Sequence, residues 1–244
     1  MTHAIERPAA ESQPRKEDFC GVPPLRNGDR LSREEFYRRW DAMPELVNAE
    51  RIEGIVSMSA SVRRKAHGRP HSHMIGWLVG YESETPGVEA GDNSTLQVGP
   101  DSDPQPDAYL LILPEHGGQC RFTEDDYIEG GPEFIAEVSS SSISRDLNKK
   151  LPLYRDNGVQ EYVVWKTEER EMLWFRLEEG DYVRASPDDD GIFRSSVFPG
   201  LWLDATAMLD GNLKQVLSVL RQGLGSAEHR AFVQQLAARR SGGA

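Results

Sequence analysis

At 244 residues the chain is long enough for one sizeable domain with its own core, because domains commonly run to roughly 100–200 residues. Hydrophobic residues make up 38% of it, and they are too scattered to give the run of about 18 that spans a bilayer, so we expect a soluble protein that does not enter a membrane. The net charge of -12 excludes a surface that is basic all over, although a local basic patch or a bound divalent ion can still hold nucleic acid.

The N-terminal segment differs in composition from the middle of the chain. Residues 1–28 are rich in Pro, Glu and Arg and show no apolar period, which predicts a flexible arm. The arm lacks the apolar core of a secretory signal and carries acids that a mitochondrial transit peptide avoids, so we expect a cytoplasmic protein. Cys20 and Cys120 have no CxxC spacing, which indicates free thiols. We divide the chain into this arm, a main domain over 29–205, and C-terminal helices with a tail over 206–244.

Helices are expected where apolar residues recur at spacings of three and four. Ser32 and Glu35 have the spacing of a capping box, Pro70 suits a helix start, and Gly158 suits a helix stop. Pro152 lies inside the third helix, where a proline costs roughly 3 kcal/mol, so we expect a kink there or a later start. The expected helices cover 33–43, 71–84, 145–157, 209–220 and 231–238.

Strands are expected where β-branched and aromatic residues cluster between Pro, Gly and Asp. Segment 50–59 is interpreted as a strand or hairpin with a turn near Gly54. The later strands are expected over 88–98, 108–113, 134–138, 161–165, 172–177 and 182–185, with Trp202 in a last short strand. Strands and helices in this order predict an α/β fold, in which a central sheet flanked by helices continues into additional antiparallel strands.

Two acids lie in or beside apolar strands. Asp107 follows Pro106 at the head of AYLLILP, and Glu137 lies inside FIAEVS, followed directly by a basic helix. An acid among apolar residues is costly to bury as an ion unless it is paired, hydrogen-bonded or bound to a metal. Two carboxylates on neighbouring strands repel each other unless a hard cation such as Mg²⁺ takes oxygens from both. The pattern therefore predicts a divalent metal site.

The run from Pro106-Asp107 through Glu137-Val138-Ser139 to RDLNKKLPLYRDNGVQEYVVW resembles the PD-(D/E)XK nuclease superfamily, and within it the Uma-type restriction endonucleases of bacteria. The resemblance covers roughly residues 30–205. It implies a restriction-endonuclease-like mixed sheet for the main domain and Mg²⁺-dependent hydrolysis of phosphodiester bonds in nucleic acid, most readily DNA, with Mn²⁺ as a substitute metal. A homodimer is expected if both strands of a duplex are cut.

The resemblance also implies which residues bind the metal. Asp107 and Glu137 match the family's catalytic acids, which hold Mg²⁺ together with the Val138 carbonyl. Glu50, at the head of ERIEGIV, matches the upstream acid that completes the metal site, and Glu53 is the alternative. The metal would polarise the scissile phosphate and lower the pKa of a bound water.

The lysine departs from the superfamily pattern, because Ser139 occupies the position two residues after the strand acid. In the Uma-type branch the lysine lies on the following helix in a K-L-x-L-Y context, which fits Lys150, with Lys149 as the alternative. A lysine from that helix can reach the same point through its long side chain, so Lys150 is expected to orient or deprotonate the attacking water.

Histidines and basic residues precede and begin the second expected helix. His67, His71 and His73 lack a fourth ligand at the usual spacing, so zinc is not expected. His71 resembles a histidine that the family has at this helix start, and it is expected to contact phosphate or water. Arg64 and Lys65 are expected to hold phosphate oxygens, with a solvated loop as the equal alternative.

A rival interpretation makes the chain a catalytically inactive nuclease-like binding or assembly module. Its acids would form a network at the centre of the sheet, and its acidic surface would contact a protein partner. The net charge of -12 favours this module, whereas the order of acid, acid and lysine favours the enzyme. Metal-dependent stability separates the two, since only an intact site binds the ion.

Overall fold

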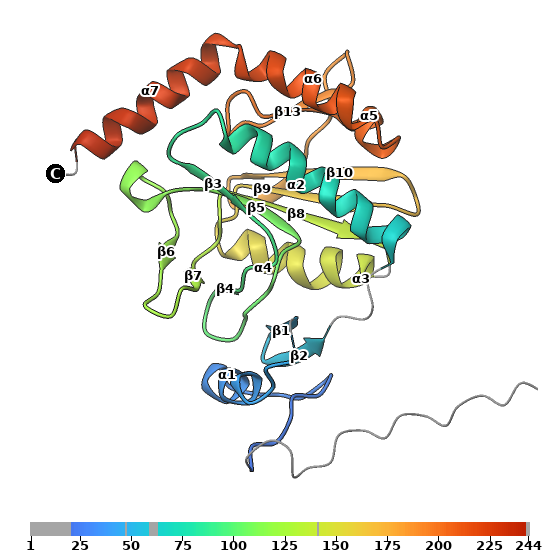
Figure 1. Ribbon diagram of the computed structural model, residues 1–244, viewed down its shortest axis with the longest axis vertical. Coiled ribbons are helices and arrows are strands. Elements are labelled where there is room, and N and C mark those ends of the chain that lie inside the picture. The colour runs from blue at the N-terminus through green and yellow to red at the C-terminus, as the bar shows by residue number, and fades with distance from the viewer. Residues whose placement is uncertain (1–20, 47, 59–62, 141, 243–244) are drawn as a thin grey trace, which may run out of the picture.

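A six-stranded sheet forms the centre of the fold. The computed structural model describes residues 21–46, 48–58, 63–140 and 142–242. The strands of the sheet are β3 (Val88–Gly91), β5 (Ala108–Ile112), β8 (Phe134–Ser139), β9 (Glu161–Lys166), β10 (Glu171–Glu178) and β11 (Asp181–Arg184). Their order is β11-β10-β9-β8-β5-β3, with β8 and β9 parallel and the other neighbours antiparallel. β5, β8, β9 and β10 lie in the middle of the molecule in Figure 1. The expected α/β fold with a mixed sheet and antiparallel additions is confirmed.

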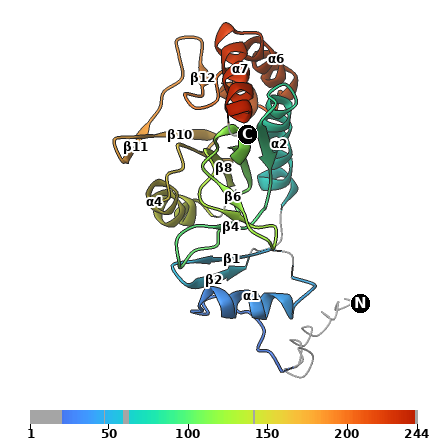
Figure 2. The same cartoon turned by 90° about the vertical axis from the view of Figure 1, so that its left-hand side faces the viewer.

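Helices cover both faces of this sheet. The elements are α2 (Arg69–Glu82), α3 (Ile143–Arg145), the π-helical turn η3 (Asp146–Lys150) and α4 (Leu151–Asp156). α2 lies on one face and α4 on the other (Figure 2). Because side chains alternate along a strand, Ala108 and Leu110 join the core under α2, while Tyr109 and Leu111 join the core under α4. β5 is therefore buried on both faces.

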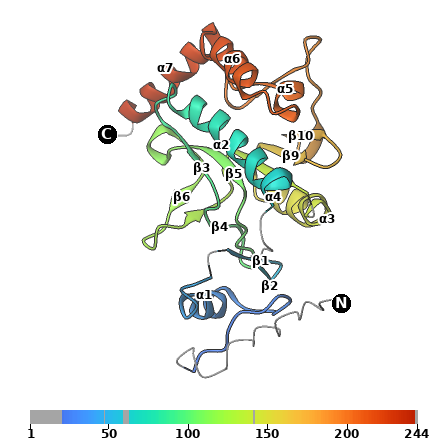
Figure 3. The same ribbon diagram turned by 45° about the vertical axis from the view of Figure 1, so that its right-hand side comes forward.

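The N-terminal part forms a small unit at one end of the molecule, away from the C-terminal helices (Figure 3). Its elements are α1 (Arg33–Asp41), β1 (Ala49–Ile52) and β2 (Ile55–Met58). Ser32 caps α1 by accepting a hydrogen bond from the Glu35 N–H at 3.3 Å, as its spacing predicts. The expected hairpin is confirmed, and its turn at Glu53 and Gly54 has φ angles of 54° and 76°.

The C-terminal segment closes the α2 side of the sheet. Its elements are β12 (Ile192–Arg194), β13 (Trp202–Asp204), α5 (Ala205–Leu209), α6 (Leu213–Leu224) and α7 (Ala227–Gly242). Val216 and Leu220 of α6 and Phe232 of α7 are buried in the same core as α2. The helix expected over 209–220 begins only at Leu213, because Gly211, with a φ of 70°, turns the chain after α5.

The strand expected over 88–98 is wrong in extent. β3 ends at Gly91, and a turn through Asn93, with a φ of 50°, sends the chain into a different sheet. Asn tolerates this left-handed conformation better than most residues, which is why the chain turns there. The three-stranded sheet consists of β4 (Leu96–Gln97), β6 (Arg121–Phe122) and β7 (Ile128–Glu129). Two short turns complete the fold, the π-helical η1 (Arg64–Gly68) and the 3-10 turn η2 (Pro114–His116).

The helix expected over 145–157 is continuous from α3 through η3 to α4, and Pro152 lies in the first turn of α4. Proline has no N–H and clashes with the carbonyl four residues earlier, so ordinary helical bonding cannot run through it. The wider π turn at Asp146–Lys150 takes up this break immediately before the proline. The expected irregularity is therefore a change of helix type upstream of Pro152.

The flexible arm expected over 1–28 is wrong for residues 25–28. Leu25 is only 3% exposed and packs with Phe36 and Val56, and the Gly28 N–H donates to the Val56 carbonyl at 2.9 Å. Leu25 is apolar and is held by these contacts, so residues 25–28 belong to the packed structure. Residues 1–20, with Cys20, lie outside the described residues. Among the residues that are described, no helix is both long and apolar enough to cross a bilayer.

Candidate active site

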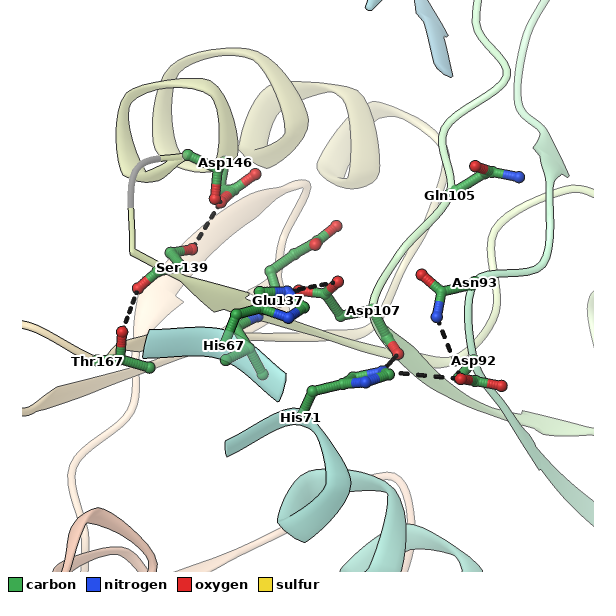
Figure 4. Close-up of polar contacts among 12 residues, drawn as sticks. His67, His71, Asp92, Asn93, Gln105, Asp107, Glu137, Ser139, Asp146 and Thr167 are labelled. Carbon is green, nitrogen blue, oxygen red and sulfur yellow. Dashed lines mark hydrogen bonds and ion pairs between the residues drawn. The ribbon is translucent and has the colours of Figure 1, made fainter. Parts of the chain in front are cut away.

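Asp107 and Glu137 lie beside each other on neighbouring strands. β5 and β8 are antiparallel with Ala108 opposite Ala136, so the next position along brings Asp107 beside Glu137. Ala108 and Ala136 face α2, and the alternation of side chains turns both carboxylates toward the opposite face. Both acids line a cleft with a volume of about 980 Å³ (Figure 4). The structure thus brings the two acids of the sequence motif into one cleft.

Lys150 joins these acids from the helix. Its ammonium lies 2.5 Å from Glu50 Oε1 and 2.8 Å from Glu137 Oε1, and its side chain is 2% exposed. Tyr154, one turn further along, donates its hydroxyl to the same Glu137 oxygen at 3.1 Å. Lys149 points elsewhere, because it is 52% exposed and contacts Glu53 at the rim. Of the two candidate lysines, Lys150 is the one that reaches the acids.

Glu50 enters the cleft from β1, and both of its carboxylate oxygens are engaged. Besides Lys150, Oε1 accepts a hydrogen bond from the Gln105 N–H at 2.9 Å. Oε2 lies 3.2 Å from the Arg145 guanidinium, which also donates to Ser57 at 2.8 Å. Glu50 is therefore surrounded by hydrogen-bond donors, two of them cationic.

Two histidines hold Asp107. His67, in η1, donates from Nε2 to the carboxylate at 3.1 and 3.2 Å, and the Val138 N–H donates to Asp107 Oδ2 at 2.7 Å. His71 donates to the backbone carbonyl of Asp107 at 2.7 Å, with Asp92 3.9 Å from the same nitrogen (Figure 4). His67 is a partner of Asp107 that the sequence motif does not predict. The four-residue spacing of the two histidines across a helix start is the signal that was present.

The electrostatics of the cleft separate the two strand acids. Burial, together with repulsion from Asp107, Asp146 and Glu50, raises the pKa of Glu137 well above its usual range despite the attraction of Lys150. Burial also opposes ionisation of Asp107, but its hydrogen bonds and the charges of His67 and Lys150 outweigh this and lower its pKa. Asp107 is therefore the readily ionised acid of the pair.

The ammonium of Lys150 is stabilised by more than one carboxylate. Burial would lower the pKa of Lys150, but the charges of Glu137, Glu50 and Asp146 raise it well above its usual value. The two carboxylates that contact the ammonium therefore favour its charged form.

The donor chemistry of Asp107 and Glu137 suits a divalent cation, whereas Glu50 already contacts two cationic side chains. Hard cations prefer carboxylate oxygens, and a bound cation would favour the ionised form of Glu137, whose pKa is raised by burial and by repulsion from neighbouring acids. Within the described ranges, however, no three His, Cys, Asp or Glu residues are grouped so that they could hold an ion. In this structure the Lys150 ammonium contacts Glu50 and Glu137 together, and Glu50 as the third metal ligand stays a prediction.

The residues expected to bind phosphate are distributed differently. Arg64 and Lys65 are exposed in η1, whereas their neighbour Arg63 lines the cleft. His71 contacts the backbone of Asp107, as described above. Arg145 and Lys149 add further positive charge along the cleft. The acidic protein therefore presents cations where its cleft opens, although Arg64 and Lys65 are outside the cleft lining.

Comparison with known proteins places the chain in a family. The family model for Uma2, described as "Putative restriction endonuclease", matches residues 33–206. The chain belongs to the Uma2 family. The Uma2 fold of this chain is shared by a crystal structure described as a putative nuclease belonging to DUF820 from Anabaena variabilis. The two are 15% identical and superpose with a TM-score of 0.50, covering 75% of this chain and 97% of that one. No curated protein sequence matches the chain.

In this Uma2 chain Ser139 occupies the position two residues after Glu137, where the superfamily has its lysine. Its hydroxyl donates to Asp146 Oδ2 at 2.6 Å, and Ser142 donates to the same oxygen at 2.6 Å. Asp146 begins η3, the turn that ends with Lys150. Ser139 therefore helps to fix the start of the helical segment that carries Lys150. The serine at the usual lysine position and the lysine on the helix are thus connected through Asp146.

Proposed function

We propose that this Uma2 protein is a Mg²⁺-dependent endonuclease that hydrolyses phosphodiester bonds in DNA. The observation that carries the proposal is the pair Asp107 and Glu137, side by side in an open cleft with the Lys150 ammonium 2.8 Å from Glu137. Membership of a restriction-endonuclease family supports a nuclease. DNA as the substrate, Mn²⁺ as a substitute metal, a homodimer that cuts both strands and a cytoplasmic location belong to the same proposal.

Each residue of the site has a distinct task in this mechanism. Asp107 and Glu137 would hold the metal, which polarises the scissile phosphate and lowers the pKa of a bound water. His67 and the Val138 N–H fix the orientation of the Asp107 carboxylate. The carboxylates around Lys150 raise its pKa and favour the ammonium, which has no lone pair with which to act as a base. It acts instead by donating hydrogen bonds to the attacking water and to the negative charge that develops on the phosphate.

The proposal predicts that Mg²⁺ and Mn²⁺ raise the thermal unfolding midpoint of the purified protein. A ligand that binds only the folded state stabilises it by RT ln(1 + [L]/Kd), which is about 2.7 kcal/mol at a hundredfold excess over Kd. The measurement is a metal titration followed by differential scanning fluorimetry, alongside cleavage of supercoiled plasmid with and without a chelator. An unfolding midpoint that does not change with metal concentration, together with an uncut plasmid, would support the inactive module instead.

A further inference from the structure

Glu50 differs from the other two acids in the kind of partner that its oxygens have. Lys150 and the Gln105 N–H occupy Oε1, and Arg145 approaches Oε2. The contacts reported for Glu137, in contrast, fall on one oxygen, Oε1. A metal at Glu50 would have to displace cations at both carboxylate oxygens, whereas at Glu137 the Lys150 ammonium and the Tyr154 hydroxyl contact the same oxygen.

The strand that carries Glu50 is firmly anchored. The neighbouring Arg51 is fully buried and lies 2.7 Å from the fully buried Asp103, and the backbones of these two residues exchange hydrogen bonds of 3.1 and 2.5 Å. The Arg51 guanidinium also donates to the carbonyls of Leu31 and Pro100. Removing one partner of a buried pair of this kind is strongly destabilising, so β1 holds its position in the fold. Glu50 is therefore a fixed point on the wall of the cleft.

We propose that Glu50 is a positioning residue that holds the Lys150 ammonium beside the reacting centre, and that it is not a metal ligand. This inference rests on the nuclease function proposed above. A lysine side chain is a flexible four-carbon stem, and Glu137 alone would have to serve both as its anchor and as a metal ligand. The Glu50 carboxylate removes that conflict, because it keeps Lys150 in place with its second oxygen compensated by Arg145. Glu137 could then bind the cation without being the sole anchor of the ammonium.

The experiment is a double-mutant cycle with Glu50→Gln and Lys150→Met, measured both as plasmid cleavage rate and as Mg²⁺ affinity from thermal shift. If Glu50 acts only through Lys150, Glu50→Gln lowers the cleavage rate about tenfold or more in the wild-type background. It should add less than about twofold in the Lys150→Met background. The Mg²⁺ dissociation constant of the single variant Glu50→Gln should stay within about threefold of the wild-type value, whereas that of Glu137→Gln should not.

Controls separate this inference from loss of fold and from failure of the nuclease itself. Glu53→Gln removes the same charge from the same hairpin at an exposed position, and it should change neither measurement. If Glu50→Gln does not fold, Glu50→Asp keeps the charge but shortens the reach, and it should lower cleavage while metal affinity is retained. A Glu50 variant that binds Mg²⁺ tenfold more weakly overturns the positioning role alone. A wild-type protein that binds no metal overturns the nuclease and this role together.

Discussion

Glu137→Gln should reduce Mg²⁺- or Mn²⁺-dependent cleavage roughly 10³-fold, the upper range for loss of a group that stabilises transition-state charge. The glutamine keeps the shape of the side chain and can still accept hydrogen bonds from Lys150 and Tyr154. It removes the negative charge that a hard cation needs beside Asp107. The measurements are single-turnover plasmid cleavage and the metal-induced shift of the unfolding midpoint. The cleavage and the shift should be lost together.

The same variant should be as stable as the wild type, or more stable, without metal at neutral and higher pH. The raised pKa of Glu137 means that the folded state favours the protonated carboxyl more than the unfolded chain does. The stability from this group is therefore present at low pH and is lost as pH rises from the usual carboxyl range through the raised pKa. Glutamine cannot ionise, so chemical denaturation at several pH values should show a smaller loss for the variant.

Glu133→Gln is a matched control for Glu137→Gln. Glu133 lies four residues earlier, immediately before β8, and its burial likewise raises its pKa. Its carboxylate accepts hydrogen bonds from the N–H groups of Ile112 and Gln119, outside the cleft lining. We expect this variant to keep its metal response and its cleavage rate. If Glu137→Gln unfolds outright instead of losing metal binding, Glu137 is a structural carboxylate and the metal site is lost as an interpretation.

The arrangement of the strand acids could be predicted from the sequence because the rule behind it is local. Asp107 begins one apolar strand and Glu137 lies within the next, and strand periodicity makes the face of each side chain a matter of counting. Lys150 could be placed for a similar reason, since its neighbours Leu147 and Tyr154 mark the apolar side of the helix. Asp107, Glu137 and Lys150, whose side-chain directions follow from strand and helix periodicity, do meet in one cleft.

The parts that could not be predicted depend on contacts between distant segments. His67 meets Asp107 across 40 positions of sequence, and Glu50 meets Arg145 only because the anchored hairpin lies against the helix. The Glu50–Arg145 contact leaves no periodic signal, and the four-residue spacing of His67 and His71 does not identify Asp107 as their partner. The strand expected through Asn93 failed because a short turn, fixed by a residue that tolerates positive φ, outweighed the β-propensity on both sides. Local sequence pattern therefore predicts the positions of the acids, whereas their partners His67 and Arg145 depend on tertiary packing.

Lys150→Ala should lower cleavage roughly 10²-fold or more, as expected for loss of an electrostatic group that contacts the reacting centre. The ammonium is 2% exposed and its pKa is raised, so the positive charge that it supplies is both present and poorly accessible to competing water. Metal affinity should change little, because Asp107 and Glu137 keep their oxygens. A plasmid-cleavage assay at saturating Mg²⁺, compared with the metal titration of the same variant, checks both expectations.

Lys149→Ala is the decisive comparison, because the two lysines are adjacent and carry the same charge. Successive residues of a helix point about 100° apart, and Lys149 accordingly lies at the rim, 52% exposed against Glu53. Its loss should change the cleavage rate by less than about threefold, since an exposed ion pair contributes little. If Lys149→Ala is the more damaging change, the lysine that acts on the phosphate is the exposed one at the rim. If neither change alters a measurable metal-dependent rate, the mechanism with a lysine on this helix is wrong.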